Sequence, residues 1–156
     1  MGKRQRGFSV VQVVIVVAIL LVIAAIAIPS LLHSKLSENE SSAVSSLRTL
    51  NASCASYSML YGGYPRSLSN LGPGNPASST SAGLIDSALA GGAKGGYVFA
   101  YTAGATGVGG NVLSYSISAN PVTPGTTGQR RFFTDQSGVI RASTAGVADA
   151  SSTPIG

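Results

Sequence analysis

The chain has 156 residues, of which 44% are hydrophobic and 10% are charged, far fewer charges than the usual quarter. That length suits one small domain together with a membrane helix. The formal charge is +5, but three of the ten basic residues precede residue 7; from residue 8 onward, seven basic residues stand against five acidic ones, which leaves +2. Because those seven are scattered apart from Arg130 and Arg131, we expect no nucleic-acid-binding patch.

The first feature in chain order is a long apolar run. Residues 13–28 contain no polar side chain, and extending the run back to residue 8 adds only Ser9 and Gln12 as polar positions. As a helix, residues 8–28 would span about 31 Å, close to the roughly 30 Å hydrocarbon core of a bilayer. The run follows three basic residues and no acidic one, a bias that keeps an N-terminus cytoplasmic: Lys3, Arg4 and Arg6. We therefore predict a single segment that spans a lipid bilayer.

A plain anchor and a secretory signal peptide are two interpretations of this run. Ala25-Ile26-Ala27 matches the A-x-A pattern of a cleavage site, and cleavage there would give a chain that starts at Ile28. Against a signal peptide, sixteen apolar residues exceed the usual length of about 7–15, and Pro29 lies just beyond the cut.

A third interpretation rests on the junction between Gly7 and Phe8. A short basic leader that ends in glycine, a phenylalanine, an apolar helix and a proline twenty-one residues after that phenylalanine (Pro29) stand here in this order. This combination resembles the N-terminus of type IV pilins and type II secretion pseudopilins. In that family a prepilin peptidase cleaves after the glycine and methylates the new N-terminal phenylalanine.

The resemblance implies how the chain is processed and assembled. Residues 1–7 would be the leader peptide, cleaved between Gly7 and Phe8, with N-methylation at Phe8. The processed chain would join a homo-oligomeric filament through its N-terminal helix, where Phe8, Gln12 and Pro29 are the expected assembly residues. Its partners would be the prepilin peptidase, an inner-membrane assembly platform and the lipid bilayer, with the head periplasmic before assembly.

Gln12 departs from the family pattern, in which the fifth residue of the mature helix is usually glutamate. In family filaments that carboxylate neutralises the N-terminal ammonium of a neighbouring subunit, which offsets the cost of burying both charges. An amide can accept a hydrogen bond from the amine but cannot cancel its charge. Two interpretations stay open: a position near the membrane interface where an amide is tolerated, or a specialised or minor subunit whose filament is neutralised by another route.

The helical pattern resumes after Pro29 and predicts one helix over residues 8–61, about 80 Å long. Residues 29–61 form its amphipathic half, and Gly62-Gly63 provides a stop. An apolar seam follows spacings of three, four and seven: Leu36, Ala43, Leu47, Leu50, Cys54, Tyr57 and Tyr61. The residues between them are expected to form the solvated face: Ser37, Glu38, Asn39, Ser41, Ser45, Arg48 and Asn51.

Residues 62–142 are expected to form a globular β head, and residues 143–156 a flexible tail. Short helical turns are predicted over residues 67–71 and 84–89, with Asp86 in the first turn of the second, and an exposed loop over 72–83. Alternating apolar residues predict antiparallel strands around residues 97–101, 113–117 and 131–133, and residues 139–141 form a further short stretch after a turn at 135–138. The fold class is therefore α+β: a pilin-like fold in which a long N-terminal helix packs on a sheet of three or four strands.

No constellation in the sequence predicts catalysis, a cofactor or a metal site. His33 is the single histidine, at the membrane edge, and Cys54 is the single cysteine, so no disulfide can form within the chain. Some major pseudopilins bind calcium near their C-terminus, where this chain offers Asp135, but calcium requires six to eight oxygen ligands and a plain turn is the favoured interpretation.

The function favoured by the sequence is a structural subunit of a type IV pilus or a related filament. The short leader and the long helix favour a pilin, whereas the small head and missing cysteine pair favour the alternative, a pseudopilin of a type II secretion system. A further alternative is a monomeric, membrane-anchored or exported binding protein. The state of the N-terminus would distinguish these classes.

Overall fold

The structure is a computed structural model that describes residues 9–155. Two compact units share the chain, Met1–Lys35 and Leu36–Gly156, and both contain part of one α-helix, α1 (Val10–Tyr61). Gly7 and Phe8 lie outside the described residues.

Helix α1 is continuous over 52 residues, about 78 Å, and Pro29 lies inside it without ending it. The predicted single helix is therefore confirmed from Val10 onward. The helix ends where Gly62 adopts a positive φ of 76°, a conformation that favours glycine, while its N–H donates to the Ser58 carbonyl at 3.0 Å.

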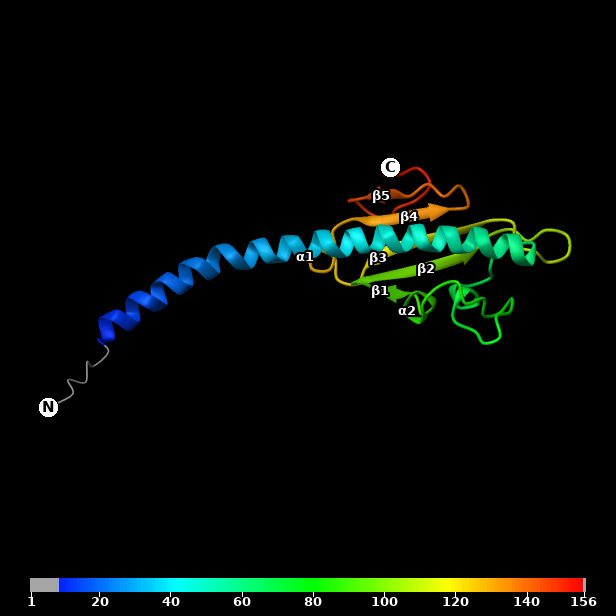
Figure 1. Cartoon of the computed structure of the whole chain (residues 1–156). Helices are drawn as coiled ribbons and strands as arrows, with labels where there is room; N and C mark the ends of the chain where they lie inside the picture. Colours follow the sequence, from blue (N-terminus) through cyan, green and yellow to red (C-terminus); the bar gives the residue numbers. More distant parts are fainter. Residues whose placement is uncertain (1–8, 156) are drawn as a thin grey trace. The chain divides into compact units, whose positions relative to one another are not determined.

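The head contains two short helical segments and a six-stranded sheet (Figure 1). The 3-10 segment η1 (Leu68–Leu71) and helix α2 (Ser87–Ala90) precede the strands. In chain order the strands are β1 (Ala93–Lys94), β2 (Tyr97–Ala103), β3 (Tyr115–Pro121), β4 (Arg131–Asp135), β5 (Arg141–Ser143) and β6 (Thr153–Pro154). Each strand pairs antiparallel with the next, so the sheet is a simple meander with the order β1 to β6. The predicted α+β, pilin-like architecture is confirmed.

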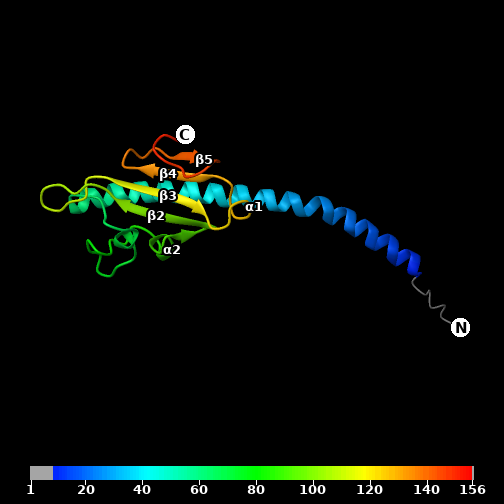
Figure 2. The ribbon, with the colours of Figure 1, turned by 180° about the vertical axis from the view of Figure 1, so that it is seen from behind.

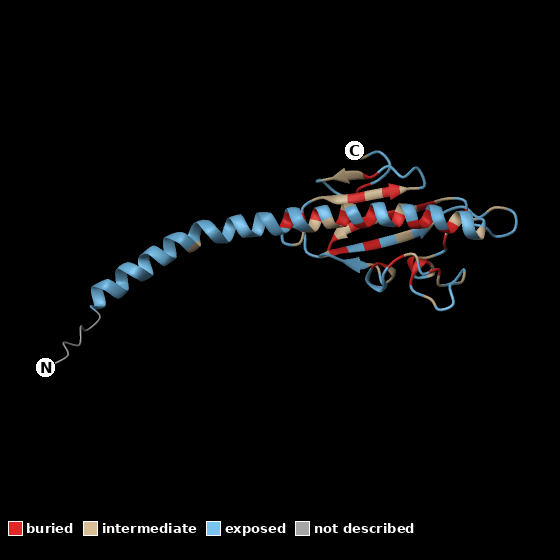
Figure 3. Cartoon of the chain, viewed as in Figure 1, coloured by how far each residue is buried: buried red, intermediate tan, exposed pale blue. Residues whose placement is uncertain are grey.

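The C-terminal half of α1 lies across one face of this sheet. Seen from behind, in Figure 2, strands β2, β3 and β4 stand in front of that half of the helix. Alternate residues of these strands point into the core, among them Phe99 on β2, Ile117 on β3 and Phe132 on β4, each at most 4% exposed. They meet Leu47 and Leu50 of the helix, both fully buried, so the predicted apolar seam packs on the sheet (Figure 3).

The sheet is larger than the three or four strands expected. Strand β5 begins at Arg141, and Ala142 pairs with Thr153 of β6. Strand β6 lies within residues 143–156, which were expected to be a flexible tail. Small and polar residues with little alternation hide this pairing in the sequence, although Ile155 donates its N–H to the Ile140 carbonyl at 2.8 Å.

Two local expectations differ from the structure. Strand β3 starts at Tyr115 and not at Leu113, because Val112 takes the buried position and bridges to Tyr64, while Leu113 stays 59% exposed. The second helical turn begins at residue 87 and is only four residues long. Asp86 is its N-cap and not a first-turn residue; its carboxylate accepts the Leu89 N–H at 2.8 Å.

Candidate functional site

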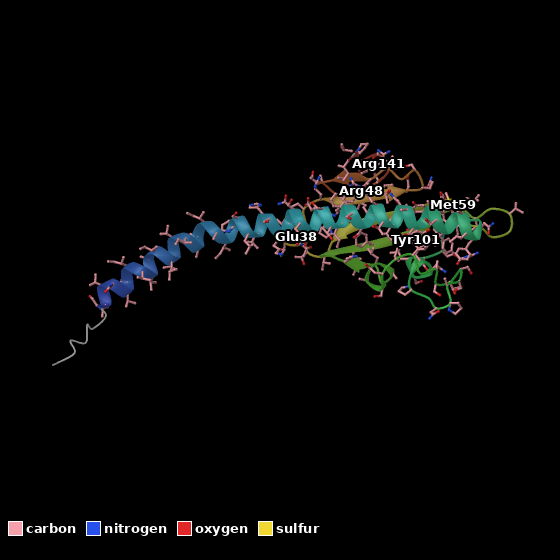
Figure 4. All side chains as sticks on the ribbon, viewed as in Figure 1. Glu38, Arg48, Met59, Tyr101 and Arg141 are labelled. Carbon is pink, nitrogen blue, oxygen red and sulfur yellow. The ribbon has the colours of Figure 1, made fainter. Side chains whose placement is uncertain are left out.

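The first half of α1 carries an apolar surface on all sides. Sixteen large apolar side chains from Val10 to Leu32 are exposed, each between 44% and 78%. Figure 4 shows these side chains projecting around the helix. Within the described chain, α1 is the one helix long and apolar enough to cross a membrane. Each such side chain gains about 1.5–3 kcal/mol when it leaves water, so this surface requires lipid or other protein around it.

The two polar positions at the start of this surface carry no charge. The Ser9 carbonyl accepts the N–H groups of Gln12 and Val13 at 2.9 and 3.2 Å, which closes the first turn. Gln12 itself is exposed, and the first turn of the helix contains no acidic residue. The partial positive charge that a helix carries at its N-terminus therefore meets an amide here and not a carboxylate.

Pro29, the other predicted assembly residue, is exposed within the helix. Because proline has no N–H, the Ala25 carbonyl one turn earlier loses its usual intrahelical partner. His33 and Lys35 follow as exposed polar residues beyond the apolar surface.

From Leu36 onward, polar side chains of α1 tie the helix to the sheet. Glu40 is only 9% exposed. Its carboxylate accepts the backbone N–H groups of Gln129 and Arg130 at 2.9 and 3.1 Å, and the Arg130 Nε at 2.7 Å. Burial opposes the charged form, but these hydrogen bonds and the Arg130 charge together lower the pKa of the Glu40 carboxyl.

Two asparagines of α1 complete these ties. The Asn39 amide donates to the Thr127 carbonyl at 2.9 Å. Asn51 donates to the Thr134 hydroxyl at 2.8 Å and accepts from the Tyr115 hydroxyl at 3.0 Å. The expectation that both asparagines belong to the solvated face is therefore wrong, since their partners lie on the sheet and its loops.

Cys54 and Asp135, the other reactive or potential metal-binding residues considered in the sequence, have structural roles. Cys54 is fully buried in the core, and this burial raises the pKa of its thiol to about 12. The Asp135 carboxylate accepts the backbone N–H and the hydroxyl of Ser137 at 2.9 and 2.5 Å, the pattern of a turn. Among residues 9–155, no group of three or more His, Cys, Asp or Glu side chains is placed to hold a metal ion.

Comparison with known proteins gives one partial similarity. No family model and no solved structure matches the chain. Over 72 residues the chain is 32% identical to the type II secretion system core protein G of Dickeya chrysanthemi. The match covers 46% of this chain and 47% of that protein, so it spans about half the length of each.

This similarity supports the pilin-like and pseudopilin family at a coarse level, and it favours the secretion-system alternative over the type IV pilus. It also agrees with the prediction that the chain is not an enzyme, since the relative is named as a core protein of a secretion system.

Proposed function

We propose that this chain is a pseudopilin, a structural subunit of a filament that a type II secretion system assembles from the inner membrane. One observation carries the proposal: α1 presents sixteen exposed apolar side chains, while the head buries its own core without them. The similarity to a type II secretion system core protein adds support and favours secretion over a pilus.

The mechanism follows from the two environments that such a surface can occupy. The apolar half of α1 holds the subunit in the bilayer as a single-pass protein, with the N-terminus cytoplasmic and the head periplasmic. An assembly platform extracts it, and neighbouring helices then bury against one another the surface that lipid covered before. Because Val, Ile and Leu dominate, these helices pack by interdigitated side chains, with closer backbone contact only near Ala24, Ala25 and Ala27.

Processing by a prepilin peptidase belongs to this proposal. Cleavage between Gly7 and Phe8 would free an ammonium at the start of the apolar helix, and N-methylation would follow at Phe8. Gln12 would hydrogen-bond to the ammonium of a neighbour but leave its charge in place. A filament of such subunits therefore needs a carboxylate from another subunit type or an ammonium near the polar surface.

Cysteine cross-linking in the native membrane tests the assembly. In a Cys54→Ala background, Val16→Cys places a thiol on the apolar surface, where Val16 is 48% exposed. We expect a flexible bis-maleimide cross-linker to give dimers, because neighbouring helices in a bundle lie about 8–10 Å apart and the linker can bridge thiols that do not face each other directly. Val147→Cys, at a head position 76% exposed, is the matched control and should stay monomeric under the same conditions.

A Gly7→Leu variant separates assembly from chance encounters in the membrane. We expect this variant to keep its leader, to retain a folded head and to lose the Val16→Cys cross-link. Two results would contradict a processed filament subunit and favour a monomeric membrane-anchored protein. One is equal cross-linking of the Val16→Cys chain with and without Gly7→Leu. The other is no cross-linking of the Val16→Cys chain that keeps Gly7.

A further inference from the structure

The head contains a pocket that the proposed filament function does not use. It lies at the end of the head where α1 ends, near the labelled Met59 in Figure 4, and has a volume of about 270 Å³. We call it the tyrosine pocket, and its main lining side chains are Tyr57, Tyr61, Tyr64, Arg66, Asn70 and Asn111. Four segments build it: the last turn of α1, the residues that follow, the loop around residue 80 and the hairpin loop before β3.

Hydrogen bonds hold these four segments together. The Tyr57 hydroxyl donates to the Ser79 carbonyl at 2.6 Å, and the Tyr64 N–H donates to the Val112 carbonyl at 2.9 Å. Gly63 permits this approach, because a Cβ there would lie 3.1 Å from the backbone N and O of Val112. The pocket is therefore a built feature of the head and is largely formed before any ligand enters.

Tyrosine rings form one wall of the pocket. The rings of Tyr57 and Tyr61 lie 4.6 Å apart between centroids, tilted by 44°, which fixes the orientation of the half-buried Tyr61. An aromatic face carries partial negative charge and attracts C–H groups that carry partial positive charge. The C–H face of a saccharide ring has this property.

The pocket also carries one positive charge without a counter-charge. The Arg66 guanidinium donates to the Gly110 carbonyl at 2.9 Å, which uses one of its five N–H donors. No carboxylate lines the pocket, and Arg66 forms no ion pair with any residue in the described part of the chain. Carboxylates and phosphates both pair well with a guanidinium, and the single negative charge of a carboxylate matches the single positive charge of Arg66.

Amide and hydroxyl groups complete the lining. Asn111 and Thr80 are both exposed and both line the pocket. Together they present both donors and acceptors, which suits the several hydroxyls of a sugar better than a purely apolar side chain. The volume suits a single ring.

We propose that the tyrosine pocket binds a small acidic saccharide, with the sugar ring on Tyr61, its carboxylate on Arg66 and its hydroxyls toward Asn111 and Thr80. This activity is independent of filament assembly, because every residue of the pocket lies in the unit Leu36–Gly156, beyond the apolar half of α1.

Binding of two matched sugars to the full chain in detergent micelles tests the proposal. Methyl glucuronide and methyl glucoside differ only in whether the ring carries a carboxylate or a hydroxymethyl group. Titration calorimetry should give a Kd at least about tenfold lower for the glucuronide, the gain typical of a hydrogen bond to a charged group. Arg66→Gln should remove this difference, and Tyr61→Ala should weaken both sugars, whereas Tyr61→Phe should retain both.

Arg131→Gln is the matched control, because Arg131 also donates to the carbonyl of a loop glycine, Gly146, at 3.0 Å. It should leave both affinities unchanged, and thermal melting should show that every variant is folded. Equal affinity for the two sugars, or a preference that survives Arg66→Gln, would overturn the proposal. Tighter binding of acetate, or of a peptide with a free C-terminal carboxylate, would overturn it in favour of a simple anion site or a peptide site.

Discussion

The two halves of α1 share one backbone and differ in what surrounds them. From Val10 to Leu32 the large apolar side chains have no partner in the described chain, whereas from Leu36 to Tyr57 the apolar seam is buried against the sheet. Polar residues behave in the opposite way. Gln12 is exposed, while Glu40 and Asn51 make specific hydrogen bonds to the head.

This contrast shows that helix formation and helix stabilisation are separate matters in this protein. Both halves are helical although Val and Ile, which are weak helix formers, dominate the first, and one proline does not interrupt the helix. The second half is stabilised within the chain, while the first half depends on lipid or on other subunits. Under the proposed function, the same helix anchors the folded head in lipid and offers its apolar surface for assembly.

The largest expected effect comes from the same substitution in the two halves. Leu47→Ala should lower the free energy of unfolding of the head by about 2–5 kcal/mol, because Leu47 is fully buried in the core. Leu20→Ala should leave that free energy unchanged, since Leu20 is 58% exposed in the apolar half. Denaturant unfolding in detergent can be followed by tyrosine circular dichroism, because all six tyrosines lie at residue 57 or beyond. Equal losses for both variants would contradict the division of the helix.

A smaller effect is expected at Asn51, whose amide joins the helix to β3 and β4. Asn51→Ala should destabilise the head by about 1–3 kcal/mol, because it leaves the Thr134 and Tyr115 hydroxyls without this partner, and Thr134 is fully buried. Thr49→Ala is the control, since Thr49 is exposed and bonds only within its own helix, to the Ser45 carbonyl. The same unfolding assay measures both variants. If Asn51→Ala lowers the free energy of unfolding no more than Thr49→Ala does, the Asn51 hydrogen bonds do not stabilise the head.

The hydrogen bonds of Glu40 should give a smaller, pH-dependent contribution to the free energy of unfolding. Because the folded-state pKa of Glu40 is lowered, its contribution is complete above the ordinary glutamate pKa of about 4.3 and is lost as pH falls through the lowered value. Glu40→Gln should therefore be less stable than the unaltered chain at pH 7, and the gap should shrink as pH falls from 5 towards 2. A gap that stays constant over this range would show that Glu40 acts by shape alone.

The smallest effect concerns Cys54, whose thiol has a pKa of about 12 because it is buried. At pH 8 the thiol should resist alkylation while the head is folded and should react at the rate of an ordinary cysteine in denaturant. Leu47→Ala should speed the reaction by making the open state more populated, whereas Leu20→Ala should not. Rapid labelling of the unaltered folded chain, measured by mass spectrometry, would contradict the burial.

Sequence patterns predict the parts of this fold that depend on apolar periodicity. The helix over both halves, the seam through Leu47 and Leu50 and the strand around Phe99 follow from spacings of 3.6 and 2. Glu40 and Asn51 could not be found in this way, because a polar residue next to an apolar seam has the same pattern whether it meets water or a sheet. Strand β6 was missed because two residues, Thr153 and Pro154, give no periodicity at all.

The tyrosine pocket could not be predicted from the sequence either, because its lining residues are far apart in the chain. The lining residues lie between positions 57 and 112. The segments that carry them come together only where backbones pack closely, as Gly63 does against Val112. The sequence does mark the segment after the helix, with Tyr61, Gly63 and Tyr64 close together, but it does not show which loops approach it. The processing residues Gly7 and Phe8 stay a prediction.

The N-terminus of the protein recovered from its native membrane tests the filament proposal most directly. Intact-mass measurement and N-terminal sequencing should find a chain that begins at Phe8 and carries one methyl group on its amine. A chain that begins at Ile28 would mean an exported protein released by signal peptidase, and an uncut chain would mean a plain membrane anchor. Either of these results would contradict a processed pseudopilin.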